Sequence, residues 1–184
     1  GLRGKTIAVG AHGGASVEVS QEVLRSCGLH PYRDYTPQIL PLATSVDMVH
    51  KGLVDAICFL SIGQSTALVE LSYYKPLRLL SLDSQKADAL VESHPYWYKS
   101  SIGPHTYPNQ STAVQTIGIP TMLVAHKDLS DNIVYDVTAV IAEHASEVGS
   151  LILPPRSFSR KLALGAVTLP RHPGAEKYLR AVQG

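Results

Sequence analysis

Short apolar runs alternate with amphipathic stretches along the first half of the chain. The apolar or β-branched runs have the length of strands, and the stretches between them carry apolar residues at helical spacing. The predicted strands are residues 6–9, 39–42, 57–60 and 77–82, and the predicted helices begin near Ser16, Thr44 or Ser45, Ser65 and Ser84. Because strands and helices alternate with short connections, the pattern predicts an α/β fold, with a mostly parallel sheet and helices on both of its faces.

The pattern changes after His94. An aromatic cluster at residues 95–98 precedes a loop over residues 103–110, whose proline and glycine content is typical of a connection between structural units. Residues 116–124 predict a long strand, which Pro120 bars from the middle of a hydrogen-bonded sheet. The helices expected beyond it are one from Ser130 to Gly149, which is the longest, a short one at 159–164 and a last one at 176–182.

The stretch that says most about function is the turn at residues 10–16, Gly-Ala-His-Gly-Gly-Ala-Ser, directly after the first predicted strand. Glycines between a buried strand and a helix let backbone N–H groups surround a small anion, and the helix N-terminus adds partial positive charge. In open α/β sheets, ligands bind at the C-terminal ends of the strands. Loops at residues 12–16, 61–64 and 106–107 are expected at that edge.

Each of these loops alone is explained as an ordinary turn, and their shared position favours a binding site. His12 is the histidine that we expect to face a ligand, because it lies within the glycine turn. The residues expected to bind a ligand are His12, Gly13, Gly14, Ala15, Ser16, Ser61, Gly63, Thr106 and Tyr107.

Composition narrows the classes of function. Apolar residues make up 45% of the chain and charged residues 17%, which predicts a packed core. The net charge of +1, and the lack of any basic run interleaved with aromatic residues, argue against a nucleic-acid partner. No stretch approaches the roughly 20 apolar residues of a membrane span. Cys27 and Cys58 lie among apolar neighbours, so no disulfide is indicated and the cysteines do not reveal the compartment.

No catalytic motif stands out. None of the eight histidines has the spacing of a zinc site, and we expect no metal or other cofactor. Residues 63–67 approach the nucleophile elbow Gly-x-Ser-x-Gly, but Ala67 stands where the second glycine belongs, and helix capping accounts for Ser65. Neither a Walker sequence nor Gly-x-Gly-x-x-Gly is present, so nucleotide binding has no support. We therefore expect a protein that is not an enzyme.

Several motifs follow one another in an order that resembles a known family. They are Leu-Arg-Gly-Lys-Thr-Ile-Ala-Val-Gly at 2–10, Gly-x-Val-Asp-Ala at 52–56, Pro-Leu-Arg-Leu-Leu at 76–80, Thr-Tyr-Pro-x-Gln at 106–110, Thr-Ile-Gly-Ile-Pro at 116–120 and His-Pro-Gly-Ala at 172–175. Together they resemble the substrate-binding receptors of TRAP transporters, in the TAXI group, essentially from end to end. The motifs at 106–110 and 172–175 are the more specific ones.

The resemblance implies a periplasmic-binding-protein-like (type II) fold with two lobes that close around a ligand. Residues 1–113 would form the second lobe, and residues 114–184 the hinge strand and the C-terminal part of the first. Such a protein is periplasmic and delivers a small carboxylate, such as glutamate, glutamine or a related organic anion, to membrane permease subunits. The family more often has Gly-Ser-Gly-Thr after proline at this turn. This chain has Ala-His-Gly-Gly-Ala-Ser at residues 11–16, so the identity of the ligand stays open.

Members of that family carry a signal peptide and a long N-terminal segment, and this sequence starts where the second lobe would begin. The apolar stripe at residues 133–148 would then be partly uncovered, so we expect self-association or a missing covering segment. Two alternatives stay open. One is the ligand-sensing domain of a transcription regulator with the same architecture, and the other is an enzyme on this fold, for which Cys27 and Cys58 are poorly placed.

Overall fold

The computed structural model describes residues 1–150 and 169–182, with the backbone alone for residues 148–150. The chain divides into two compact units, Gly1–Gly118 and Ile119–Gly184, and each is described by itself. The sequence boundary at 113/114 falls just before strand β5 (Val114–Gly118), which is paired within the first unit. The assignment of the two parts to lobes stays a prediction, and the short helix expected at 159–164 lies outside the described residues.

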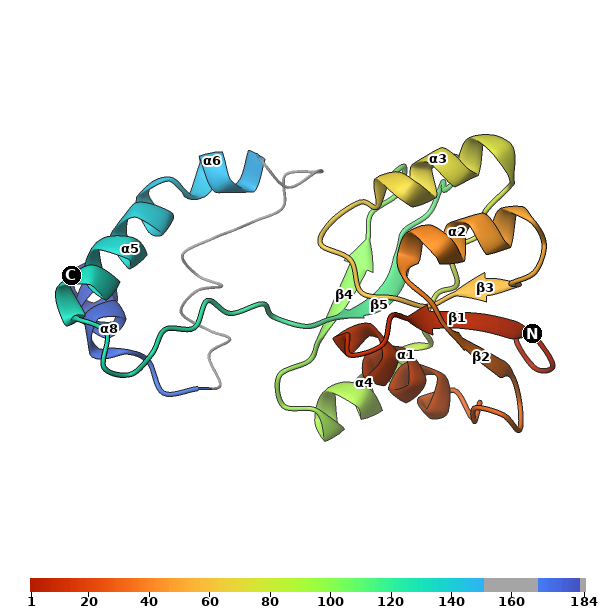
Figure 1. The fold of residues 1–184 in the computed structure, drawn as a ribbon, viewed down its shortest axis with the longest axis horizontal. Coiled ribbons are helices and arrows are strands. Elements are labelled where there is room, and N and C mark those ends of the chain that lie inside the picture. Colours follow the sequence, from red (N-terminus) through yellow and green to blue (C-terminus); the bar gives the residue numbers. More distant parts are fainter. Residues whose placement is uncertain (151–168, 183–184) are drawn as a thin grey trace. The chain divides into compact units, whose positions relative to one another are not determined.

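A parallel sheet of three strands forms the centre of the first unit (Figure 1). Its strands are β1 (Thr6–Gly10), β2 (Thr36–Ile39) and β3 (Ala56–Ile57), in the order β2-β1-β3. In this register Ile7 lies between Pro37 on one neighbour and Ala56 on the other. The parallel pairing, with helices between successive strands, confirms the α/β class.

The side chains of β1 alternate between two apolar clusters on opposite faces of the sheet. Ile7 and Val9 are buried in the cluster that includes Leu24 of α1 (Ala15–Ser26). Ala8 is buried in the other cluster, which includes side chains from α2 (Leu42–His50) and α3 (Thr66–Tyr74). Burying an aliphatic side chain of this size stabilises a fold by about 1.5–3 kcal/mol. The prediction of helices on both faces is therefore confirmed, with α1 and α4 (Ser84–Ser93) on one side and α2 and α3 on the other (Figure 1).

A separate antiparallel ladder was not predicted. Strand β4 (Tyr98–Ile102) pairs with β5 over five residues, between the predicted aromatic cluster at 95–98 and the predicted loop at 103–110, where the sequence predicted no strand. At one end of this ladder the Tyr98 ring lies over Gly118, where an added Cβ would stand 2.4 Å from the ring. The pairing comes from contact with a partner strand distant in the sequence, because the mostly polar and exposed residues of β4 show no strand-like apolar run.

The strand expected at residues 77–82 is wrong, since this extended segment is not part of either sheet. One backbone hydrogen bond, from Leu82 N–H to the Gln115 carbonyl at 2.9 Å, joins it to β5. A second bond uses a side chain, because Gln115 N–H donates to the Ser81 hydroxyl at 3.1 Å. The segment is thus attached to β5 without forming a ladder with it.

Proline and a hydroxyl group shift the ends of three predicted strands. β2 ends at Ile39, earlier than expected, because Pro41 stands at the N-cap of α2. β3 is shorter than expected, because Leu60 N–H donates to a serine hydroxyl and not to β1. β5 ends at Gly118, before Pro120, whereas the sequence predicted a strand at 116–124.

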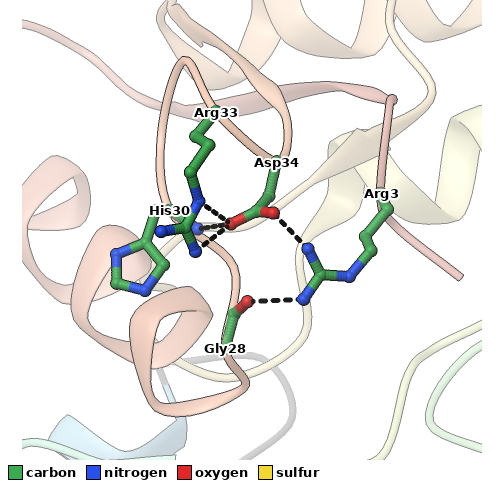
Figure 2. Close-up of polar contacts among 5 residues, drawn as sticks. All are labelled: Arg3, Gly28, His30, Arg33 and Asp34. Carbon is green, nitrogen blue, oxygen red and sulfur yellow. Dashed lines mark hydrogen bonds and ion pairs between the residues drawn. The ribbon is translucent and has the colours of Figure 1, made fainter.

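The turn before β2 is fixed by the half-buried Asp34 (Figure 2). One carboxylate oxygen pairs with the guanidinium of Arg3, and the other accepts from the His30 N–H at 2.9 Å and from Arg33 at 2.8 Å. Arg3 also donates to the Gly28 carbonyl at 3.0 Å. The His30 N–H and the two guanidinium groups lower the pKa of Asp34 to about 2. This cluster ties the end of α1 and the start of β2 to the residues that lead into β1.

The second unit is helical in its described part. α5 (Asp131–Glu143) follows Ser130 at its N-cap, as expected, but the predicted single helix is interrupted at His144 and continues as α6 (Ala145–Ser150). α8 (Pro173–Ala181) begins earlier than expected, with the His172 ring accepting from Gly174 N–H. α8 packs closely on α5, since a Cβ on Gly174 would lie 2.2 Å from the Asp131 carbonyl oxygen.

Candidate functional site

A cavity of about 230 Å³ lies at the C-terminal ends of the three parallel strands. Its walls come from the turn after β1, the residues between β2 and α2, and the end of β3. The lining residues are Gly10, Ala11, Gly14, Ser16, Leu40, Pro41, Leu42, Ser45, Ile57, Phe59 and Leu60. None of these residues carries a charged side chain, so a ligand here meets apolar groups, two hydroxyls and backbone.

Two helices start at this cavity without a side chain that caps them. Gly14 is the N-cap of α1 and Pro41 is the N-cap of α2, and neither position has a side-chain capping hydrogen bond. The N–H groups of a helix's first turn have no partner within the helix, and the helix dipole places partial positive charge there. These two N-termini can therefore hold a negatively charged group of a ligand.

Gly10 brings the start of α1 against the end of β1. Its backbone has φ +111°, a conformation that favours glycine, and a Cβ at this position would lie 2.4 Å from the Ser16 Cβ. Any larger residue would push the first turn of α1 away from the strand. The shape of the cavity wall thus depends on this one glycine.

The Ser16 hydroxyl connects two sides of the cavity. It accepts a hydrogen bond from the Leu60 N–H at 3.2 Å, and so joins the first turn of α1 to the residues that follow β3. Because a hydroxyl can accept and donate at once, the same group can still donate to a ligand. Ser16 is the second residue of α1, whereas the sequence predicted it as the N-cap.

The loops at residues 61–65 and 106–110 are held together by hydrogen bonds. The Gln64 side-chain amide donates to the Thr106 carbonyl, and the Ser65 N–H donates to the Tyr107 hydroxyl at 2.9 Å. Ser65 and Tyr107 are both buried. The Tyr107 hydroxyl therefore supports the N-terminus of α3. It contacts the neighbouring loop and does not line the cavity at the edge of the parallel sheet.

Gln110 fixes the loop that carries Tyr107. Its side-chain oxygen accepts from the Tyr107 N–H at 3.1 Å, and its amide nitrogen donates to the carbonyls of Gly103 at 2.8 Å and Thr112 at 2.9 Å. These bonds hold a loop in which His105 and Asn109 adopt positive φ. The Thr-Tyr-Pro-x-Gln motif is thus explained by structure, as a rigid support for residues 61–65.

The predicted site residues fall into two groups in the structure. Gly14 and Ser16 line the cavity. The others stand beside it or support it: His12, Gly13 and Ala15 are exposed in the same turn, Ser61 donates to the Gly63 carbonyl at 3.2 Å, Thr106 donates to the Gly103 carbonyl at 2.8 Å, and Tyr107 is buried. Hydrogen bonds link Ser16 to Leu60 and residues 64–65 to residues 106–107. The loop with residues 106–107 lies between β4 and β5 of the antiparallel ladder and does not follow a strand of the parallel sheet.

Sequence reasoning missed the wall formed by residues 40–45. These residues follow β2, which lies directly beside β1 in the sheet. The signal that could have found them was present, since a strand followed by proline and a new helix places another helix N-terminus at the same edge. Ser45, expected as a cap, lies inside α2, and its hydroxyl donates to the Pro41 carbonyl at 2.9 Å.

Neither cysteine lines the cavity. Burial raises the pKa of the Cys58 thiol, while Cys27 is exposed, and both are free.

Among residues 1–150 and 169–182, no cluster of three or more His, Cys, Asp or Glu is placed to hold a metal ion. Within the same described part of the chain, none of the helices combines the length and the apolar character needed to cross a membrane.

A comparison of the sequence with known protein families gives one finding that bears on the site. The model of the NMT1-like family matches residues 1–182. The match includes both units and therefore the whole sheet-edge cavity.

Proposed function

This chain belongs to the NMT1-like family, a periplasmic-binding-type family related to solute receptors, and on that basis we propose that it is the extracytoplasmic receptor of a TRAP-type transporter of the TAXI group. Its substrate would be a small carboxylate such as glutamate, glutamine or a related organic anion. It would bind that solute without changing it and deliver it to membrane permease subunits. The mixed α/β structure with its parallel sheet is compatible with a periplasmic-binding-protein-like fold.

The observation that carries the proposal is the pair of uncapped helix N-termini at one cavity. The first turns of α1 and α2 both meet the cavity at the C-terminal edge of the sheet. A carboxylate placed there would accept hydrogen bonds from backbone N–H groups and from the Ser16 hydroxyl. The partial positive charge at both helix N-termini would stabilise it further. Since no lining side chain is charged, these dipoles would supply the attraction.

The size and lining of the cavity support a small ligand with an aliphatic part. A volume of about 230 Å³ is below the usual range of drug-sized pockets, roughly 300–1,000 Å³. Leu40, Leu42 and Phe59 provide an apolar wall of the same cavity. A small carboxylate would place its charge at the helices and its carbon chain on this wall.

The experiment is a binding screen on the full chain. Melting temperature and equilibrium dialysis are measured with glutamate, glutamine, other amino acids and a series of mono- and dicarboxylates. We expect at least one carboxylate to raise the melting temperature and to be retained, and its neutral amide or ester to be retained less. No response across the whole panel, or equal retention of the neutral compounds, would overturn the proposal.

A matched pair of variants locates the binding. Ala11→Leu places a large side chain at a position that lines the cavity, and Ala43→Leu makes the same change at an exposed position of α2 that does not. We expect Ala11→Leu to abolish retention of the carboxylate and Ala43→Leu to leave it unchanged. Unchanged retention in Ala11→Leu, with both variants folded by circular dichroism, would place the ligand elsewhere.

Self-association is a further part of the proposal. Ile133, Val137 and Val140 of α5 lie on one helix face at spacings of four and three, and they are 50%, 43% and 57% exposed. Apolar faces of this kind mark contact surfaces. A monomer by light scattering, together with no binding of a dye that reports exposed apolar surface, would count against it.

A further inference from the structure

A second cavity, of about 140 Å³, lies in the first unit between residues 77–79 and residues 107–112. It shares no lining residue with the sheet-edge cavity. We propose that this second cavity is a binding site for a short aliphatic carboxylate, independent of the function proposed above.

Arg78 gives the second cavity its charge. Arg78 lies among the lining residues between Leu77 and Leu79 and is exposed, and it has no ion pair or hydrogen bond with any residue in the described part of the chain. No acidic residue lines the cavity. The described part of the chain has five other arginines. Four of them pair with a carboxylate, and the fifth, Arg171, makes another contact. Arg78 therefore leaves a positive charge at the cavity without a carboxylate to neutralise it.

The remaining lining is divided between polar and apolar groups. Asn109, Ser111 and Thr112 supply an amide and two hydroxyls from the loop. Leu77 and Leu79 supply apolar surface from the extended segment. A ligand with a charged end and a short apolar end matches this division, because each end then meets groups of its own kind.

The loop on one side of the cavity is held rigidly before any ligand arrives. The Gln110 amide donates to the carbonyls of Gly103 and Thr112, and its oxygen accepts from the Tyr107 N–H. This network keeps Asn109 at φ +62°, a left-handed conformation that L residues rarely adopt. A preformed wall lowers the entropy that a ligand must offset on binding.

The chemistry of Arg78 selects the charged group. A guanidinium offers two parallel N–H donors that match the two oxygens of a carboxylate. The volume limits the rest of the ligand, since one water takes about 30 Å³ of liquid and the cavity therefore has room for only a few heavy atoms. Butyrate combines a carboxylate with a three-carbon chain and is the probe that we choose.

The test is a titration of the ¹⁵N-labelled full chain with sodium butyrate, followed by the shifts of backbone amide signals. We expect the amides of residues 109–112 to shift in a saturable way. Arg78→Gln should weaken this response by about tenfold or more, since the charged hydrogen bonds to the carboxylate are lost. The response of Arg78→Lys should lie between those of the unchanged protein and Arg78→Gln, because lysine keeps the positive charge but lacks the two parallel N–H donors. Lys86→Gln, which removes the same charge elsewhere on this unit, should match the unchanged protein.

Several outcomes would overturn the second site. They are the absence of any shift at residues 109–112, the same response in Arg78→Gln, and the same response to 1-butanol, which has the chain without the charge. Shifts confined to Gly14 and Ser16 would also overturn it and would support carboxylate binding at the sheet edge alone. The two proposals fail separately. If only the function proposed above is wrong, butyrate still shifts the amides of residues 109–112, and Ala11→Leu leaves the retention of every ligand unchanged.

Discussion

The hydroxyl of Ser16 accepts a hydrogen bond from the backbone N–H of Leu60, 44 residues further along the chain, at 3.2 Å. This bond joins the first turn of α1 to the residues that leave β3. It is one reason why β3 ends early, because the N–H that would extend the strand is directed to a side chain. It also closes one side of the sheet-edge cavity, which both residues line.

Ser16→Ala should weaken carboxylate binding and lower stability by a small amount. Removing the hydroxyl takes away a donor to the ligand, a change of about tenfold in affinity for a charged hydrogen bond. Losing the bond to Leu60 should lower the free energy of unfolding by about 1 kcal/mol, since Leu60 is partly exposed and water can replace the hydroxyl. Calorimetric titration and urea unfolding measure the two effects.

Ser26→Ala is the control for Ser16→Ala, because Ser26 lies at the other end of α1 and its hydroxyl donates to the Val23 carbonyl. It should leave carboxylate affinity unchanged. An equal loss of affinity in the two variants would mean that Ser16 acts through the helix and not through contact with the ligand.

Gly10→Ala should lower the free energy of unfolding by about 3 kcal/mol. The new Cβ would lie 2.4 Å from the Ser16 Cβ, and the backbone would also be held at φ +111°. Overpacking typically costs about 1–3 kcal/mol and a left-handed backbone about 1–2 kcal/mol. Gly4→Ala separates the two causes, because Gly4 has φ +71° with open space around it. Urea unfolding should show about 1 kcal/mol for Gly4→Ala, and equal values for the two variants would contradict the close approach.

Tyr107→Phe should act on stability more than on ligand affinity. The change leaves the buried Ser65 N–H without its acceptor, which costs about 1–3 kcal/mol. Thermal unfolding measures this loss, and the carboxylate titration used for Ser16→Ala measures the affinity. An affinity loss larger than that of Ser16→Ala, with stability unchanged, would instead make the Tyr107 hydroxyl a ligand contact.

Asp34 should make stability depend on pH in the acid range. Its pKa is about 2 in the folded protein, against an ordinary value of 3.8, because the His30 N–H, Arg33 and Arg3 favour the ionised form. The unfolded chain therefore binds more protons between these two values, so the contribution is complete above about pH 4 and is lost as the pH falls toward 2. Urea unfolding at pH 5, 3 and 2 should show a steeper fall for the unchanged protein than for Asp34→Asn.

Asp55 contributes in the same direction. The Thr6 N–H and the Lys5 side chain lower the pKa of its carboxyl. The double variant Asp34→Asn, Asp55→Asn should therefore respond to acid less than either single variant. If the free energy of unfolding falls with acid as steeply in Asp34→Asn as in the unchanged protein, the cluster in Figure 2 does not hold the Asp34 carboxylate in its ionised form.

Local sequence was sufficient to predict the centre of the first unit. Residues 6–9 are β-branched or small and apolar, and a glycine turn and an amphipathic helix follow them. Each of these signals depends on neighbours in the chain, and the structure has a buried β1 and α1 at these positions. The glycine turn was identified for the same reason, and it forms one wall of the cavity.

Pairings between distant residues were beyond that reasoning. β4 has no apolar periodicity of its own and is a strand because β5 lies beside it. Residues 77–82 have strand-like periodicity, yet they make a single backbone bond to β5 and form no ladder. Strand formation depends on an available partner edge, which periodicity within one segment does not report.

The site divides in the same way. The sequence determined that loops with glycine and hydroxyl residues follow the strands, and that a helix begins at the first of them. Only the tertiary structure decided which groups face the cavity: it added residues 40–45, turned the Ser16 hydroxyl toward Leu60 and buried that of Tyr107 under α3. The reason is that a hydrogen bond across 40 or more residues depends on where the sheet places both partners, and no local pattern contains that distance.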